Sequence, residues 1–94
     1  MSVIEKIRQR IRDRDYYVSS HADEEMVEDR FERQDVENAI LRGVVDKKLT
    51  RDPRGTRYRI AGPANDGRTM HVICRFCQAG SLVIITVYER GRRR

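Results

Sequence analysis

Arginine and histidine side chains recur at alternate positions in two segments of the second half of the chain. Arg57 and Arg59 belong to the first segment, and His71 and Arg75 belong to the second. Guanidinium groups bind phosphate through two hydrogen bonds and stay charged at any working pH, whereas histidine titrates near neutrality and can transfer protons. RNA cleavage by its own 2′-hydroxyl requires a base, cations around the phosphate and an acid. These residue types therefore fit metal-independent RNA cleavage, with an ordinary solvated sheet face as the alternative.

His21, near the start of an expected helix, is a second candidate for proton transfer. The positive end of a helix dipole disfavours imidazolium and would keep the ring neutral, while Glu24 and Glu25 act in the opposite direction. The alternative is a histidine that only makes local hydrogen bonds. We expect His21 or His71 to transfer the proton, and Tyr88 to stack on or orient a base of the RNA.

The spacing His71-x-x-Cys74-x-x-Cys77, together with His21, raises the alternative of a tetrahedral zinc site. It is disfavoured because His71 and Cys74 point to opposite faces of a regular strand. We expect no metal, and we assign Cys74 to the core as a small apolar residue. The chain also lacks a P-loop, a GxGxxG motif, a nucleophile elbow and an HExxH motif, so no cofactor is expected.

Helical patterns fill the first half of the chain. Three helices are predicted, at about 2–13, 21–29 and 34–42. Ser2 and Glu5 form a capping box before the first of them. Ser20 is the expected N-cap of the second helix, and acidic pairs such as Glu24 and Glu25 are expected on its solvated face. Gly43 is the expected stop of the third helix.

From Val44 the apolar period becomes two. Four strands are predicted, at about 44–50, 57–62, 70–76 and 82–89, joined by turn sequences. The expected core residues alternate along two of these strands: Tyr58, Ile60, Met70, Val72, Cys74 and Phe76. The predicted fold is α+β, with the N-terminal helices packed on one face of a four-stranded antiparallel meander. The expected domain spans 1–89, followed by a basic disordered tail at 90–94.

Charge is unevenly distributed along the chain. The net charge is +5, but residues 47–94 hold twelve Lys and Arg against three Asp and Glu, whereas 16–46 hold three against nine. Such asymmetry predicts one basic surface that attracts polyanions and one acidic surface. No apolar run is long enough to span a membrane, the N-terminus lacks a signal-peptide pattern, and two cysteines form no disulfide framework. We expect a cytoplasmic protein with no membrane partner.

Short motifs resemble the domain-of-unknown-function 4258 family over about residues 16–89. They are Ser19-Ser20-His21-Ala22, Met26, Arg30, Asp35-Val36, Ala39-Ile40, Gly43, Tyr58-Arg59-Ile60, His71-Val72-Ile73 and the segment 83–88. That family is similar to BrnT-type and RelE-like toxins of bacterial toxin–antitoxin pairs. The resemblance implies a RelE-like fold, ribonuclease activity without cofactor, and neutralisation by a small antitoxin protein. It singles out His21, Arg30 and Tyr88, but the Cys74/Cys77 pair and the basic tail lie outside its pattern.

Together these observations predict an endoribonuclease whose partner is RNA. Arg30, Arg57 and Arg75 are expected to stabilise phosphate charge, and Arg59, Arg75 and Lys47 to bind the RNA backbone. One alternative is a non-catalytic module that binds nucleic acid or protein through the same face. Another is a protein-interaction domain whose acidic helices form the main surface. A homodimer is also left open.

Overall fold

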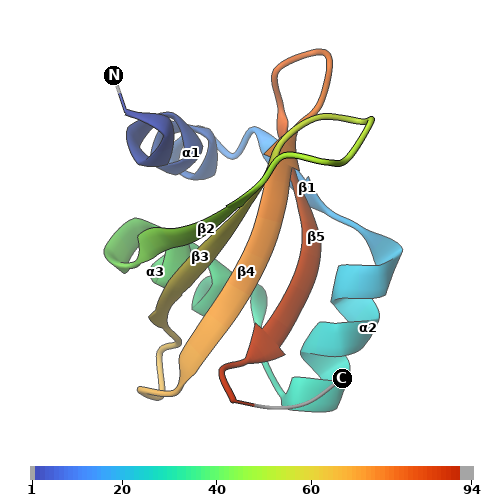
Figure 1. Cartoon of the computed structure of the whole chain (residues 1–94). Coiled ribbons are helices and arrows are strands. Elements are labelled where there is room, and N and C mark those ends of the chain that lie inside the picture. Colours follow the sequence, from blue (N-terminus) through green and yellow to red (C-terminus); the bar gives the residue numbers. More distant parts are fainter. Residues whose placement is uncertain (1, 92–94) are drawn as a thin grey trace.

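A computed structural model describes residues 2–91 of the chain, and it shows three helices and a five-stranded sheet (Figure 1). In chain order the elements are α1 (Val3–Arg12), β1 (Tyr16–Val18), α2 (Ser20–Asp29), α3 (Arg33–Arg42), β2 (Val44–Leu49), β3 (Arg57–Pro63), β4 (Thr69–Phe76) and β5 (Leu82–Glu89). The predicted helices and the four predicted strands are therefore confirmed, with ends that move by one residue or so. The α+β class is also confirmed.

The sheet differs from the prediction by one strand. Its order is β1-β5-β4-β3-β2, and the antiparallel meander of β2 to β5 is present as expected. The prediction of four antiparallel strands is wrong because β1 joins the edge of β5 in parallel, with Tyr16 opposite Leu82 and Val18 opposite Ile84. A three-residue strand whose partner lies more than sixty residues away leaves no local pattern that would predict its pairing.

The helices begin at capping residues that the sequence identifies only in part. Ser2 caps α1 as predicted, accepting a hydrogen bond from the Glu5 N–H. The N-cap of α2 is Ser19 rather than Ser20, because the Ser19 hydroxyl accepts the Ala22 N–H at 3.1 Å. At α3, the N–H of the N-cap residue Glu32 donates to the Asp35 carboxylate at 2.7 Å.

The core lies between the helices and one face of the sheet. Ile60, Met70, Val72 and Cys74 are fully buried against apolar residues from all three helices, and Tyr58 and Phe76 pack at its margin. The predicted alternation is therefore correct for β3 and β4. Because neighbouring residues of a strand point to opposite faces, the intervening Arg and His side chains lie on the other side of the sheet. We call that side the open face.

The outer edge of β5 is covered first by β1 and then by side chains of α2. The Val87 N–H donates to the Glu25 carboxylate at 3.1 Å, and the Glu89 N–H donates to the Asp29 carboxylate at 2.9 Å. The expectation that Glu25 belongs to a solvated face is wrong, since the residue is only 6% exposed. These carboxylates satisfy strand N–H groups that would otherwise form an unpaired edge.

The expected tail begins with Arg90 and Gly91, which form a turn after β5. The Arg90 N–H donates to the Thr69 carbonyl at 2.9 Å. Residues 92–94 lie outside the described residues. None of the helices within residues 2–91 has the length and apolar character to cross a membrane.

Candidate nucleic-acid-binding face

The open face carries two groups of polar side chains, one toward each end of β4. The first, which we call the His71 cluster, consists of Asp46, Arg59, His71 and Tyr88. The second, which we call the arginine pocket, is lined by Ser19, Asp52, Arg54, Arg57, Arg75, Val83 and Ile85. His71 and Arg75 are four residues apart on β4, so the two groups are separated by about 13 Å along the strand.

An irregularity in β2 brings a carboxylate into the His71 cluster. The register between β2 and β3 shifts between Val45 and Lys47, which places Asp46 and Lys47 side by side against Arg59. The Arg59 guanidinium donates to both Asp46 oxygens, at 2.8 and 3.1 Å. This ion pair is bidentate and therefore fixes the guanidinium in one orientation.

The His71 ring is enclosed by its neighbours. It stands edge-on to the Tyr88 ring, with centroids 5.1 Å apart, and its Nε2 lies 3.7 Å from Asp46 Oδ2. His71 is 8% exposed, and its ring nitrogens are covered and have no hydrogen-bond partner among the described residues. The fold therefore buries the His71 ring without giving its nitrogens a hydrogen-bond partner within residues 2–91.

Electrostatics favour a neutral His71. Burial lowers the pKa of His71 below its ordinary value, the nearby Arg59 guanidinium lowers it further, and the Asp46 carboxylate opposes both. The hydrogen bond from Arg59 in turn lowers the pKa of Asp46. At neutral pH the cluster therefore holds an ionised Asp46–Arg59 pair beside an uncharged imidazole, which is the form that accepts a proton.

The arginine pocket lies under the loop that joins β2 to β3. This loop, residues 50–56, crosses the open face in front of β4 (Figure 1). The pocket has a volume of about 170 Å³. Asp52 lies at its wall, with Oδ2 3.3 Å from Arg57 Nε and Oδ1 3.5 Å from Arg54 Nε. Val83 is buried even though it shares the face of Arg75, because the loop covers that end of the sheet.

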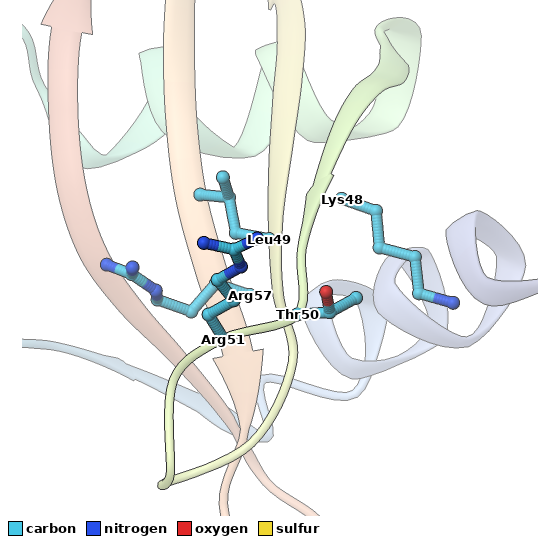
Figure 2. A pocket seen from close by; sticks show the side chains of 5 residues that line it. All are labelled: Lys48, Leu49, Thr50, Arg51 and Arg57. Atoms are coloured by element: carbon cyan, nitrogen blue, oxygen red, sulfur yellow. The ribbon is translucent and has the colours of Figure 1, made fainter.

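A second hollow of about 240 Å³ lies beside the loop and is lined by Lys48, Leu49, Thr50, Arg51 and Arg57. Figure 2 shows the side chains of Leu49, Arg51 and Arg57 on the open face over β4, whereas Lys48 extends away from it toward α1. Arg57 therefore borders both hollows. Positive charge continues from the arginine pocket toward the β2 edge of the sheet.

The structure gathers five of the predicted site residues on the open face: Arg57, Arg59, His71, Arg75 and Tyr88. Lys47 lies opposite Arg59 on the edge strand β2 and is exposed. Only the grouping of these residues is established by this placement; their roles in catalysis and RNA binding stay predictions.

The other two predicted residues lie outside the open face: His21 belongs to the first turn of α2, and Arg30 follows the last residue of that helix. His21 is 65% exposed at its side chain, and its Nε2 lies 3.2 Å from the Glu25 carboxylate. Arg30 is the C-cap of α2 in the left-handed conformation, and its carbonyl accepts a hydrogen bond from Arg68 at 2.9 Å. Neither residue belongs to the His71 cluster or lines the arginine pocket.

Four polar residues that were not among the predicted site residues contribute to the open face: Ser19, Asp46, Asp52 and Arg54. Asp52 is an acidic residue inside the most basic part of the chain and Asp46 directly precedes that part, which is a signal that could have identified them as partners of arginines. Ser19 is held beside the pocket by β5, because its N–H donates to the Ile84 carbonyl and its hydroxyl donates to the Ile85 carbonyl. His71 and Cys74 face opposite sides of β4, as expected, and within residues 2–91 no three His, Cys, Asp or Glu side chains come together in a group that could hold a metal.

Comparison with known proteins identifies one family. A search of curated proteins found no match, and neither did a search of solved structures. The family model described as "Domain of unknown function (DUF4258)" matches residues 18–89, which include α2, α3 and all strands from β2 to β5. This match spans more than half of the sequence, and the chain therefore belongs to the family of domain of unknown function 4258.

Proposed function

We propose that this protein is a metal-independent endoribonuclease of the RelE-like or BrnT-like toxin kind, which binds RNA on the open face and acts in the cytoplasm. The observation that carries the proposal is the gathering of Arg57, Arg59, His71 and Arg75 on a sheet face that no helix within residues 2–91 covers. Helices packed on the other face support the likeness to the RelE fold. A small antitoxin protein is the partner that this reading implies.

The chemistry assigned to the face uses His71 as the base. The neutral imidazole accepts the proton of a 2′-hydroxyl, the 2′-oxygen attacks phosphorus, and the 5′-oxygen leaves with a proton returned by the imidazolium. Arg59 and the arginines of the pocket stabilise the charge that develops on the phosphate oxygens. The product is a 2′,3′-cyclic phosphate and a free 5′-hydroxyl. No metal takes part in this scheme.

RNA must first uncover His71, since both ring nitrogens are covered by neighbouring side chains. Tyr88 is half-buried and contacts His71 edge-on through ring packing. An RNA base that stacks on Tyr88 can draw this ring aside and open Nε2 to the 2′-hydroxyl. In this reading Tyr88 orients the base and couples binding to exposure of the proton acceptor.

Cleavage of a single-stranded RNA in the presence of EDTA tests the proposal. We expect a 2′,3′-cyclic phosphate product from the RNA and none from the same sequence with 2′-O-methyl groups. His71→Gln should lower the cleavage rate by about 100-fold or more. The matched control is His21→Gln, which removes the other histidine and should leave the rate within twofold. Equal rates in both variants, or loss only in His21→Gln, would contradict the assignment.

A non-catalytic RNA-binding module is the second candidate, favoured by one feature of the His71 cluster. The Arg59 guanidinium is already held by Asp46 in a bidentate pair, and His71 is covered beside it. This candidate predicts RNA binding that weakens steeply with salt and no cleaved product. The protein-interaction alternative loses three of its acidic residues, because Glu25, Asp29 and Asp35 are buried, while Asp23, Glu24 and Glu28 stay exposed on α2.

A further inference from the structure

We propose that the arginine pocket binds a phosphate group, and that Asp52 occupies this site as an internal anion while no ligand is bound. The choice of an RNA phosphate as the natural ligand rests on the proposed function. The phosphate site itself rests only on the geometry of the pocket. The occupant belongs to the β2–β3 loop, so ligand binding and loop position are coupled.

The charge of the pocket is not balanced by its own carboxylate. Three arginines line it, Arg54, Arg57 and Arg75, against the single acidic residue Asp52, so the charges of its lining residues sum to +2. Within residues 2–91, Arg75 makes no ion pair with any carboxylate. Val83 and Ile85 form the apolar floor, which lowers the local dielectric and strengthens the attraction for an anion.

Arg57 supplies the clearest sign that Asp52 does not satisfy the site fully. Its Nε is buried, yet it has no hydrogen-bond partner among the described residues. The nearest carboxylate oxygen, Asp52 Oδ2, lies 3.3 Å away but does not meet the geometry of a hydrogen bond. A buried donor left in this state costs free energy. A phosphate oxygen that enters the pocket can accept this hydrogen, because guanidinium groups hold phosphate in a fork of parallel bonds.

The Asp52 carboxyl group in the pocket is ionised. Its side chain is 9% exposed. The Arg54 backbone N–H donates to Asp52 Oδ1 at 2.9 Å and lowers the pKa of this carboxyl, and the guanidinium groups of Arg54 and Arg57 add to that effect. The carboxylate is therefore ionised at neutral pH. Its place against Arg57 is the place that a phosphate oxygen would take.

The loop can release Asp52 with the loss of few polar contacts, while Val83 loses part of its cover. Its hydrogen bonds are internal, from Arg54 and Gly55 N–H groups to Asp52. The Asp52–Arg57 ion pair is the one polar contact that the structure shows between residues 51–56 and the sheet. An incoming phosphate exchanges one anion for another at Arg57 and leaves the turn intact. We infer that ligand binding moves the loop away from the pocket.

Titration with inorganic phosphate at constant ionic strength tests the site without RNA. The readout is the set of arginine Nε–H resonances in two-dimensional NMR spectra, with saturation giving Kd. Asp52→Asn should bind phosphate about two to five times more tightly, since it removes the competing charge. Asparagine keeps the side-chain oxygen that accepts the Arg54 N–H, and Asp52→Ser is a second variant that can form a similar turn. Arg75→Gln should weaken binding about tenfold.

The matched control is Asp66→Asn. Asp66 lies in the β3–β4 loop, where its carboxylate accepts the Arg68 backbone N–H at 3.1 Å and pairs with Arg68 Nε at 2.8 Å. It repeats the Asp52–Arg54 arrangement away from the pocket, so Asp66→Asn should leave phosphate affinity unchanged. Equal effects of Asp52→Asn and Asp66→Asn, or normal affinity in Arg75→Gln, would overturn the site. Phosphate binding without RNA cleavage would refute the ribonuclease proposal alone.

Discussion

The His71 cluster and the arginine pocket pair arginine with aspartate in two different ways. In the cluster, Asp46 belongs to a strand and holds Arg59 through two hydrogen bonds. In the pocket, Asp52 belongs to a loop and leaves Arg57 Nε without a hydrogen bond. The same two residue types therefore form a fixed ion pair in the cluster and an exchangeable ion pair in the pocket. The difference depends on whether the carboxylate is anchored in the sheet.

The two regions therefore suit different tasks. A fixed guanidinium beside a neutral imidazole has the preorganisation that catalysis requires. A guanidinium with an unmet hydrogen bond and a movable anion suits ligand exchange. About 13 Å separates them along β4, so one extended RNA strand could contact both. Substitutions can separate the two regions, and the one that disturbs both should have the largest effect.

Gly62→Ala should have the largest effect because it disturbs β3, which carries arginines of both regions. A Cβ at Gly62 would lie 2.1 Å from the Ala39 carbonyl oxygen of α3, so strand and helix must separate. We expect a loss of about 3 kcal/mol in the free energy of unfolding, measured by urea denaturation. The control is Gly67→Ala. A Cβ at Gly67 would meet no other atom, but the residue has a φ of +92°, so this substitution should lower the free energy of unfolding by about 1 kcal/mol. Equal losses would mean that β3 and α3 are not in close contact.

Replacing Arg57 and Arg75 of the arginine pocket should weaken RNA binding strongly and leave the His71 cluster intact. The plot of the logarithm of the RNA association constant against the logarithm of salt concentration has a negative slope. In the double variant Arg57→Gln, Arg75→Gln the magnitude of this slope should fall by about 1.4, which corresponds to two phosphate contacts to a single strand. Affinity should fall by at least about tenfold. The matched control is Lys6→Gln with Arg12→Gln, which removes two exposed charges from α1. An unchanged slope in the first variant would place RNA elsewhere.

Between pH 7 and pH 5 the stability of the protein should depend on pH through His71 rather than through Asp52 of the arginine pocket, whose lowered pKa acts only at more acid pH. The pKa of His71 is lowered in the folded state, so the unfolded chain takes up the proton first as pH falls. His71 therefore contributes stability above its ordinary pKa of 6.5, and this contribution is lost as pH falls below that value. His71→Gln should give a shallower loss of stability between pH 7 and pH 5. The control His21→Gln retains His71, so the contribution of His71 to the pH dependence of stability should be unchanged.

The smallest expected effects are changes in the pKa of His71 itself, measured by NMR titration of its ring proton. Asp46→Asn removes a charge that raises this pKa and should move it further down. Arg59→Gln removes a charge that lowers it and should move it up. The control Arg57→Gln changes the other region and should leave the value in place. Shifts of the same sign in the first two variants would contradict the arrangement of the cluster.

Much of the fold follows from local patterns, whereas the detail of the site does not. Alternation along β4 correctly separates core residues such as Val72 from His71 and Arg75, because period two is a property of any strand. The parallel pairing of β1 was missed, since it joins segments far apart in sequence. The burial of Glu25 was missed for the same reason: its partner is a backbone N–H of β5.

The two carboxylates on the open face were missed for reasons of geometry. Asp46 reaches Arg59 only because β2 shifts its register there, and such irregularities have no reliable signal in one sequence. Asp52 reaches Arg57 only because the loop folds back over the sheet. Turn residues such as Asp52-Pro53-Arg54-Gly55 predict a turn but do not specify the direction in which it leans. The unmet hydrogen bonds of His71 likewise become visible only in the packed structure.

Mapping the RNA contacts is the most direct test of whether the open face binds RNA. A single-stranded oligonucleotide with 2′-O-methyl groups, which cannot be cleaved, is added to isotope-labelled protein and backbone amide shifts are followed. Binding on the open face should give the largest shifts along β3, β4 and β5, at Arg57, Arg59, His71, Arg75 and Tyr88, together with the loop that carries Asp52. Shifts concentrated on α1 or α2, or no shifts at all, would contradict it.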